Sequence, residues 1–177
     1  MADHWIVLPA PNNQDDKLQQ ALAANRNTDE QGQWLAVHVL YSKCTCSLRI
    51  IEHLFSQPRI PGIKEKILFI DAPKPEWLTQ AQANGFSYQE LTPQQLHTTY
   101  NVSAAPLLVV VDPESKLRYV GGYTLSKQSA DVKDLAIIGT LLAQQVVVPI
   151  PLFGCAISKE LQKLIDPWGL KYAFFRG

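Results

Sequence analysis

Cysteine is scarce in this chain, which has three cysteines among 177 residues. Three thiols are too few for a framework of structural disulfides, and they are one short of a four-thiolate zinc or iron–sulfur site. The count is also odd, so disulfides within the chain would leave one thiol over. We therefore expect the cysteines to form a reactive site rather than to staple the fold.

An excess of one charge is also lacking. Acidic and basic residues number 16 each, and no block of five or more like charges occurs. Nucleic acids and anionic membranes bind proteins through concentrated basic faces. The sequence therefore argues against both as partners.

Long hydrophobic runs are missing as well. The longest candidate, residues 141–151, contains two glutamines and two prolines, and a membrane helix needs about 20 apolar residues. The first 16 residues lack the basic start and the apolar core of a secretory signal. We expect a soluble chain without a membrane span, beginning either at a native start or after a removed anchor.

The sequence shows neither internal repeats nor low-complexity segments. Its length suits one domain with a substantial core. We predict a single domain over 1–177, with a core at about 34–146. An N-terminal strand and helix at 4–25 precede the core, and a C-terminal extension at 147–177 follows it.

Within the core, apolar runs alternate with helical periodicity. The run 34–41 (WLAVHVLY) is nearly all apolar, as is typical of a central parallel strand buried on both faces. Thr92, Pro93 and Gln95 form a capping box with proline at the first helical position. The other predicted strands are 4–8, 65–71, 107–111 and 117–120, with 87–91 as a strand or connector, and the predicted helices are 15–24, 47–56, 76–84, 92–100, 131–145 and 158–166.

This order of elements, β, α, β, α, β, β, α, predicts an α/β fold. It resembles a thioredoxin-like three-layer α/β/α sandwich with a central mixed sheet, here followed by a C-terminal extension.

Two cysteines one residue apart, Cys44 and Cys46, lie between the first core strand and its helix. A cysteine at a helix N-terminus faces unpaired N–H groups and the positive end of the helix dipole, which favour the thiolate. Lys43 would act in the same direction. We predict Cys44 as the nucleophile and Cys46 as its partner in a strained, labile disulfide. The alternative is a pair of buried, inert thiols.

Pro106 begins the strand 107–111. In a thioredoxin-like fold such a proline is usually cis, with its loop against the redox turn, and the backbone of Ala105 could bind a substrate peptide by strand addition. The alternative is a plain proline at the start of a strand.

Cys155 stands alone in PLFGC. Three roles fit it equally: it could resolve a mixed disulfide, complete a three-thiolate metal site with Cys44 and Cys46, or be simply buried.

The histidines and the strand-end acids are weak signals. His38 is expected to be a hydrogen-bonded core residue, and His53 lies about two helical turns beyond Cys46. Asp71 and Asp112 suit turns or caps. His4 and His97 carry no prediction.

Three motifs in the right order support a closer resemblance. They are the CTCS turn, the hairpin LLVVVDPESKLRYVGGYTLSK and the element PLFGCAI. Over residues 34–157 the chain resembles the RedB-type branch of thioredoxin-like proteins, which are thiol-disulfide isomerase or oxidoreductase-like. The resemblance implies a redox role for Cys44 and Cys46, a functional Cys155, and a bacterial cell-envelope location behind an N-terminal membrane anchor.

The leading hypothesis is thus a monomeric thiol-disulfide oxidoreductase or isomerase that acts on protein thiols or disulfides without a cofactor. It would work in the envelope or periplasm, with the cytoplasm as the alternative. A second hypothesis is a module that binds copper(I) or another soft metal through Cys44, Cys46 and Cys155. A third is a non-catalytic interaction domain that has kept the fold.

Overall fold

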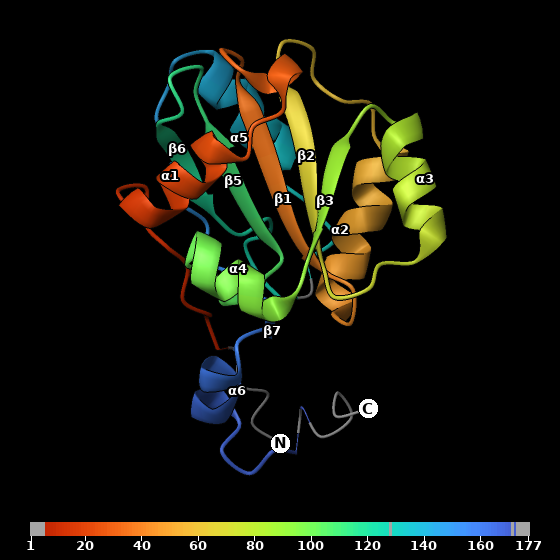
Figure 1. Ribbon diagram of the computed structural model, residues 1–177, viewed down its shortest axis with the longest axis vertical. Coiled ribbons are helices and arrows are strands. Elements are labelled where there is room, and N and C mark those ends of the chain that lie inside the picture. The colour runs from red at the N-terminus through yellow and green to blue at the C-terminus, as the bar shows by residue number, and fades with distance from the viewer. Residues whose placement is uncertain (1–5, 128, 171, 173–177) are drawn as a thin grey trace.

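A five-stranded mixed sheet forms the centre of the protein (Figure 1). The computed structural model describes residues 6–127, 129–170 and 172. The strand order is β3-β2-β1-β5-β6, with β1, β2 and β3 parallel and β5 and β6 antiparallel to their neighbours. The strands are β1 (Leu35–Tyr41), β2 (Lys64–Ile70), β3 (Ser87–Leu91), β5 (Leu107–Val111) and β6 (Leu117–Gly121).

Strand β1 lies in the middle of this sheet, as the sequence predicts. All seven of its residues are buried, because helices cover both of its faces, and this explains its continuous apolar sequence. It pairs with β2 from Leu35 opposite Lys64 to Tyr41 opposite Ile70. The carboxyl ends of β1 and β2 therefore meet at the turn that carries Cys44.

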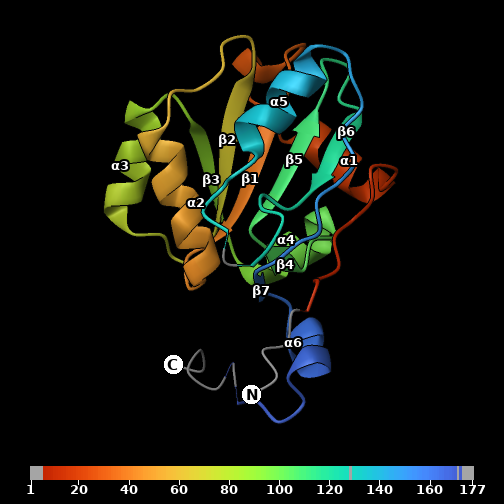
Figure 2. The same cartoon turned by 180° about the vertical axis from the view of Figure 1, so that it is seen from behind.

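Helices pack on both faces of the sheet, which makes the expected three layers (Figures 1 and 2). One face is covered by α1 (Asp16–Ala24) and α4 (Pro93–Tyr100), and the other by α2 (Thr45–Ser56), α3 (Pro75–Ala83) and α5 (Asp134–Leu142). A 3-10 turn, η1 (Thr28–Glu30), precedes β1, and α6 (Lys159–Ile165) lies in the C-terminal extension. The fold is thioredoxin-like.

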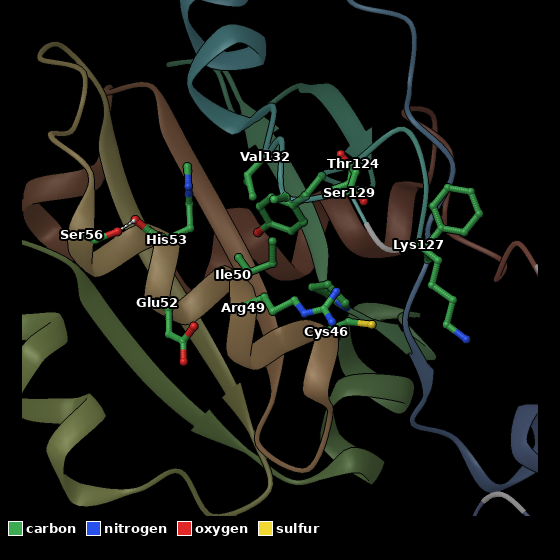
Figure 3. A pocket seen from close by; sticks show the side chains of 14 residues that line it. Cys46, Arg49, Ile50, Glu52, His53, Ser56, Thr124, Lys127, Ser129 and Val132 are labelled. Carbon is green, nitrogen blue, oxygen red and sulfur yellow. Dashed lines mark hydrogen bonds between the residues drawn. The ribbon is translucent and has the colours of Figure 1, made fainter.

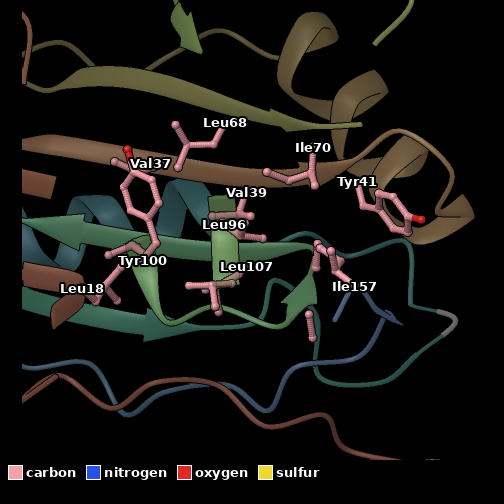
Figure 4. Close-up of a cluster of buried hydrophobic side chains, with 14 of the residues drawn as sticks. Leu18, Val37, Val39, Tyr41, Leu68, Ile70, Leu96, Tyr100, Leu107 and Ile157 are labelled. Carbon is pink, nitrogen blue, oxygen red and sulfur yellow. The ribbon is translucent and has the colours of Figure 1, made fainter. Parts of the chain in front are cut away.

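Each face has its own hydrophobic core. Figure 4 shows the first, where residues of β1, β2 and β5 pack against Leu18 of α1 and against Leu96 and Tyr100 of α4. The second core joins Ile50, Ile51 and Leu54 of α2 to Ile138 and Leu141 of α5.

Some predicted boundaries need correction. Helix α2 begins at Thr45 rather than 47, so Cys46 lies in its first turn, and α5 is shorter than 131–145. Part of the predicted strand 4–8 lies outside the described residues. Of the remainder, Leu8 forms an isolated bridge to Leu152, since the prolines that follow cannot donate to a ladder.

The C-terminal extension returns to the core. After α5, the carbonyl of Ile150 accepts a 2.8 Å hydrogen bond from the N–H of Gly122. Strand β7 (Cys155–Ala156) then pairs antiparallel with β4 (Ala104–Ala105), with Cys155 opposite Ala105. The approach requires glycine at 154, because a Cβ there would lie 2.0 Å from the carbonyl oxygen of Ala105. The extension is thereby brought to the turn that carries Cys44.

Within the described part of the chain, no helix has both the length and the apolar character that crossing a membrane requires.

Candidate active site

Cys44 lies at the junction of β1 and α2, where it is the N-cap of the helix. Its N–H donates to the carbonyl of Tyr41 at 2.9 Å, and its carbonyl accepts the first helical hydrogen bond from Leu48 at 3.0 Å. The side chain is completely buried. Ser47 supports the turn, because its hydroxyl accepts a 3.0 Å hydrogen bond from the N–H of Tyr41. The predicted strand-to-helix position of the cysteines is confirmed.

The three cysteines meet at this junction. Cys44 is hydrogen-bonded to both Cys46 and Cys155, and its thiol also donates to the carbonyl of Ala105, with a sulfur–oxygen distance of 3.9 Å. None of the three is in a disulfide, and Cys46 and Cys155 are half-buried. Cys44 is therefore the central sulfur of the cluster. The position of Cys155 beside it could not be predicted from the spacing of the cysteines in the sequence.

The predicted stabilisation of the Cys44 thiolate is wrong for the reduced protein. The hydrogen bond with Cys155 raises the pKa of Cys44, the one with Cys46 lowers it, and burial raises it again, to about 11. A backbone N–H of the helix start, that of Ser47, does lower this pKa, as the helix-terminus argument expects. Its effect is outweighed by a neighbouring sulfur and by the loss of water.

Cys46 is subject to opposing effects. Its hydrogen bond with Cys44 and its burial raise its pKa above the ordinary value, and the charges of Lys127 and Arg49 offset this rise only in part. Lys43, predicted to act on the thiols, instead forms a 2.9 Å ion pair with Asp71. Its charge is directed at the end of β2, and the cations that act on Cys46 come from α2 and from the segment after β6.

The loop of Pro106 lies against the thiols, and the Ala105–Pro106 peptide bond is cis. Ala105 is buried, and its backbone faces Cys155 in the β4–β7 pair. The strand-addition site expected at Ala105 is therefore occupied by the chain's own β7. Any molecule that approaches the sulfurs has to do so from another side.

Such an approach exists on the side of Cys46. A pocket of about 430 Å³ opens there between α2 and the loop that leads to α5. Figure 3 shows Arg49, Cys46 and Lys127 at the same end of it. The lining residues are Cys46, Arg49, Ile50, Glu52, His53, Ser56, Pro106, Tyr123, Thr124, Lys127, Ser129, Ala130, Val132 and Phe153.

A chain of hydrogen-bonded polar side chains, most of them buried, lies behind the pocket and is called the buried chain below. His53 bonds to Asp134 at 2.7 Å, and Arg59 bonds to the other oxygen of that carboxylate at 2.8 Å. Arg59 also binds both carboxylate oxygens of Glu65, at 2.6 and 2.8 Å. Glu65 bonds to His38 at 3.0 Å.

His38 completes this chain by bonding to the hydroxyl of Tyr123 at 2.8 Å. It is fully buried with both ring nitrogens paired, so its predicted role as a satisfied core residue is confirmed. Burial raises the pKa of Glu65, but hydrogen bonds from Arg59 and His38 lower it to about 2. Arg59, Glu65 and Asp134 were not predicted from the sequence as residues near the site. The one signal was a charge at Glu65 inside an apolar strand.

The remaining weak signals have structural roles. Asp112 holds the β5–β6 turn, since its carboxylate accepts a 2.9 Å hydrogen bond from the N–H of Lys116. His97 bonds to the hydroxyl of Ser103 at 3.0 Å. His4 lies outside the described residues.

A metal ion was the second sequence hypothesis. Across the described ranges, no group of three or more histidine, cysteine, aspartate or glutamate side chains is arranged to hold one. Three thiolates suit a soft ion by their chemistry, but Cys44, Cys46 and Cys155 would have to move to enclose it.

No protein-family model matches the chain, and no curated protein matches it either. A solved hypothetical protein of Sinorhizobium meliloti 1021 has a TM-score of 0.54 at 19% identity, covering 72% of this chain and 80% of its own. An uncharacterized conserved protein of Geobacillus kaustophilus has 0.56 at 17%, covering 73% and 78%. A secreted Mycobacterium tuberculosis disulfide oxidoreductase has 0.45 at 12%, covering 65% and 84%. The first two similarities show that this chain shares its fold with other solved proteins.

Proposed function

We propose that this protein exchanges thiols and disulfides with a substrate through Cys46, Cys44 and Cys155. The observation that carries the proposal is the meeting of all three thiols at one buried sulfur, that of Cys44. Thiol–disulfide exchange requires sulfurs in contact, because a thiolate attacks a disulfide sulfur directly. Inert core cysteines have no need to converge from α2 and from β7.

The exposure of the thiols sets the order of the steps. Cys44 has no contact with solvent, whereas Cys46 lines the pocket. The Cys46 thiolate attacks one sulfur of the substrate disulfide and expels the other as a thiolate, which takes up a proton. This assigns the first attack to Cys46 rather than to Cys44, the nucleophile expected from the sequence.

Cys44 resolves the mixed disulfide. Its thiolate attacks the sulfur of Cys46, forms the Cys44–Cys46 disulfide and releases the second substrate thiol. Two electrons have then passed from the protein to the substrate, which has become two thiols. The three-residue ring is strained, and strained disulfides are labile.

Cys155 is the next thiol to react with Cys44. Its thiolate attacks Cys44 and forms the Cys44–Cys155 disulfide, which restores the thiol of Cys46. Strand β7 holds Cys155 opposite Ala105, where a peptide substrate was expected to pair. The C-terminal extension thus takes the place of a substrate peptide at Ala105. A dithiol reductant of the cell then reduces the Cys44–Cys155 disulfide and returns the protein to its reduced form.

The test is the reduction of a neutral small disulfide, 2-hydroxyethyl disulfide, with a dithiol as the electron donor. Cys44→Ser and Cys46→Ser should each abolish catalysis, and Cys155→Ser should permit one turnover and slow the following ones. Unchanged rates in Cys44→Ser would reject the proposal and favour a non-catalytic domain. If the protein shows no exchange and binds one copper(I) through the three thiols, the soft-metal hypothesis replaces it.

We further propose the bacterial cell envelope as the location and protein disulfides as substrates. The resemblance to RedB-type proteins supports both, and an oxidising compartment is where disulfides persist. Fractionation of cells that make the native protein tests the location, and recovery in the cytoplasmic fraction would reject it.

A further inference from the structure

We infer that the pocket beside Cys46 selects disulfide substrates that carry a carboxylate close to the reacting sulfur. The inference rests on the proposed exchange function and specifies its substrate class.

Two cations stand at the Cys46 end of the pocket. Arg49 projects from α2 and Lys127 from the segment after β6, and both act electrostatically on the Cys46 sulfur. Neither forms an ion pair with a carboxylate among the residues that the structure describes. Their charges are therefore available to an anionic group of a substrate.

Negative charge is kept away from the same end. Glu52 is the one acidic side chain in the lining, and Figure 3 shows its carboxylate pointing away from the sulfur of Cys46. The acid behind His53, Asp134, is fully buried and already bonded to His53 and Arg59. Among the charged side chains that line the pocket, those close to the sulfur are consequently the two cations.

The shape of the site favours a compact ligand. A volume of about 430 Å³ is that of a small-molecule pocket rather than of an extended groove. Ile50, Val132 and Phe153 supply apolar wall. Because β7 occupies the backbone of Ala105, an extended peptide cannot add a strand there. The chemistry recognised is a short apolar group with a carboxylate, from a low-molecular-mass disulfide or from an acidic residue beside a protein cystine.

The experiment compares three symmetric small disulfides of similar size. Dithiodipropionate carries a carboxylate on each half, 2-hydroxyethyl disulfide a hydroxyl, and cystamine an ammonium. Each catalysed rate is divided by the uncatalysed rate of the same disulfide with a neutral thiol, which removes differences in intrinsic reactivity. The normalised rate should fall from anion to neutral to cation, by about tenfold or more overall at low salt. Added salt should compress the ratio.

Variants assign the effect to the two cations. Arg49→Gln and Lys127→Gln should each reduce the anion-to-cation ratio about threefold, and the double variant should bring it near unity. Lys17→Gln is the matched control, because this exposed lysine lies on α1, across the sheet. It should leave the ratio unchanged.

The outcomes separate the two proposals. If none of the three disulfides is reduced, the exchange function fails. If all three are reduced with equal normalised rates, or if the double variant keeps the preference, the exchange function stands and the carboxylate inference is overturned.

The source of the carboxylate is decided by a further pair of probes. These are two cystine peptides that differ by aspartate or asparagine beside the half-cystine. A preference for the aspartate peptide indicates an acidic protein segment, and its absence together with a preference for dithiodipropionate indicates a small molecule. Absence of both preferences rejects the inference.

Discussion

The two ends of helix α2 hold their polar groups in different ways. At its first turn, the Cys44 thiol is hydrogen-bonded to the thiols of Cys46 and Cys155 and to the carbonyl of Ala105, at a sulfur–oxygen distance of 3.9 Å. Along its last turns, His53 joins a chain of side chains linked at 2.6 to 3.0 Å. Weak hydrogen bonds at the first turn allow the sulfurs to exchange bonding partners. Strong hydrogen bonds at the last turns hold His53 in place.

The buried chain also serves the reactive side. It ties α2 through His53 to α5 through Asp134, and to β1 and β2 through His38 and Glu65. Its two ends, His53 and Tyr123, line the pocket next to Cys46. Because helix, sheet and pocket wall are cross-linked, Cys44 and Cys46 are presented from a rigid frame.

The largest effect is expected at the central sulfur. Cys44→Ser should lower the rate of disulfide reduction by at least about 100-fold, since a hydroxyl cannot resolve a mixed disulfide. Urea unfolding should show a stability close to that of the parent protein, which separates lost chemistry from lost folding. A variant that retains more than a tenth of the activity would place the essential sulfur elsewhere.

In the buried chain, the loss should appear in stability. Asp134→Asn removes the charge that faces both Arg59 and His53, and we expect a loss of about 3 kcal/mol in the free energy of unfolding. Asp131→Asn is the control. Its carboxylate is exposed and pairs with Lys133, so its loss should cost less than about 1 kcal/mol. Equal costs in urea unfolding would show that the chain does not hold the fold.

Acid should weaken the buried chain by protonating Glu65. Burial raises the pKa of Glu65, but Arg59 and His38 lower it to about 2, below its ordinary 4.5. The stability that Glu65 contributes is therefore fully present above its pKa of 4.5 in the unfolded protein. It is lost as pH falls through the pKa of about 2 in the folded protein. Unfolding measured from pH 5 to 2 should lose about 3 kcal/mol that Glu65→Gln does not lose. A parallel pH dependence in both proteins would contradict the assignment.

The smallest effect concerns the acidity of Cys44. Its pKa of about 11 reflects first the hydrogen bond with Cys155. Cys155→Ala should lower this pKa and raise the thiolate fraction at neutral pH, by about tenfold for each unit. Thiolate absorbance followed against pH measures the change, with Cys46→Ala as the comparison, because Cys46 acts in the opposite direction. A rise of the pKa in Cys155→Ala would reverse the described coupling.

The sequence predicted well what local patterns determine. Apolar runs gave β1 and β2, and the capping box of Thr92 gave α4, because burial and capping act on neighbouring residues. The turn of Cys44 followed from these elements. The position of Cys155 did not, because it depends on a short antiparallel pair between segments about 50 residues apart.

The thiol chemistry shows the limit of local reasoning more clearly. The helix start does lower the pKa of Cys44, as expected, but Cys155 and burial outweigh it, and neither is visible in the spacing of the cysteines. The buried chain was missed for the same reason. Arg59 and Asp134 are 75 residues apart and meet only in the folded protein.

The most direct measurement is disulfide mapping by mass spectrometry across a series of glutathione redox buffers, with thiols trapped by acid and alkylation. If Cys44 is the common partner, intermediate buffers should yield two disulfides in exchange, Cys44–Cys46 and Cys44–Cys155, each with a definable reduction potential. A dominant Cys46–Cys155 bond, or three thiols that stay reduced throughout, would contradict a relay centred on Cys44.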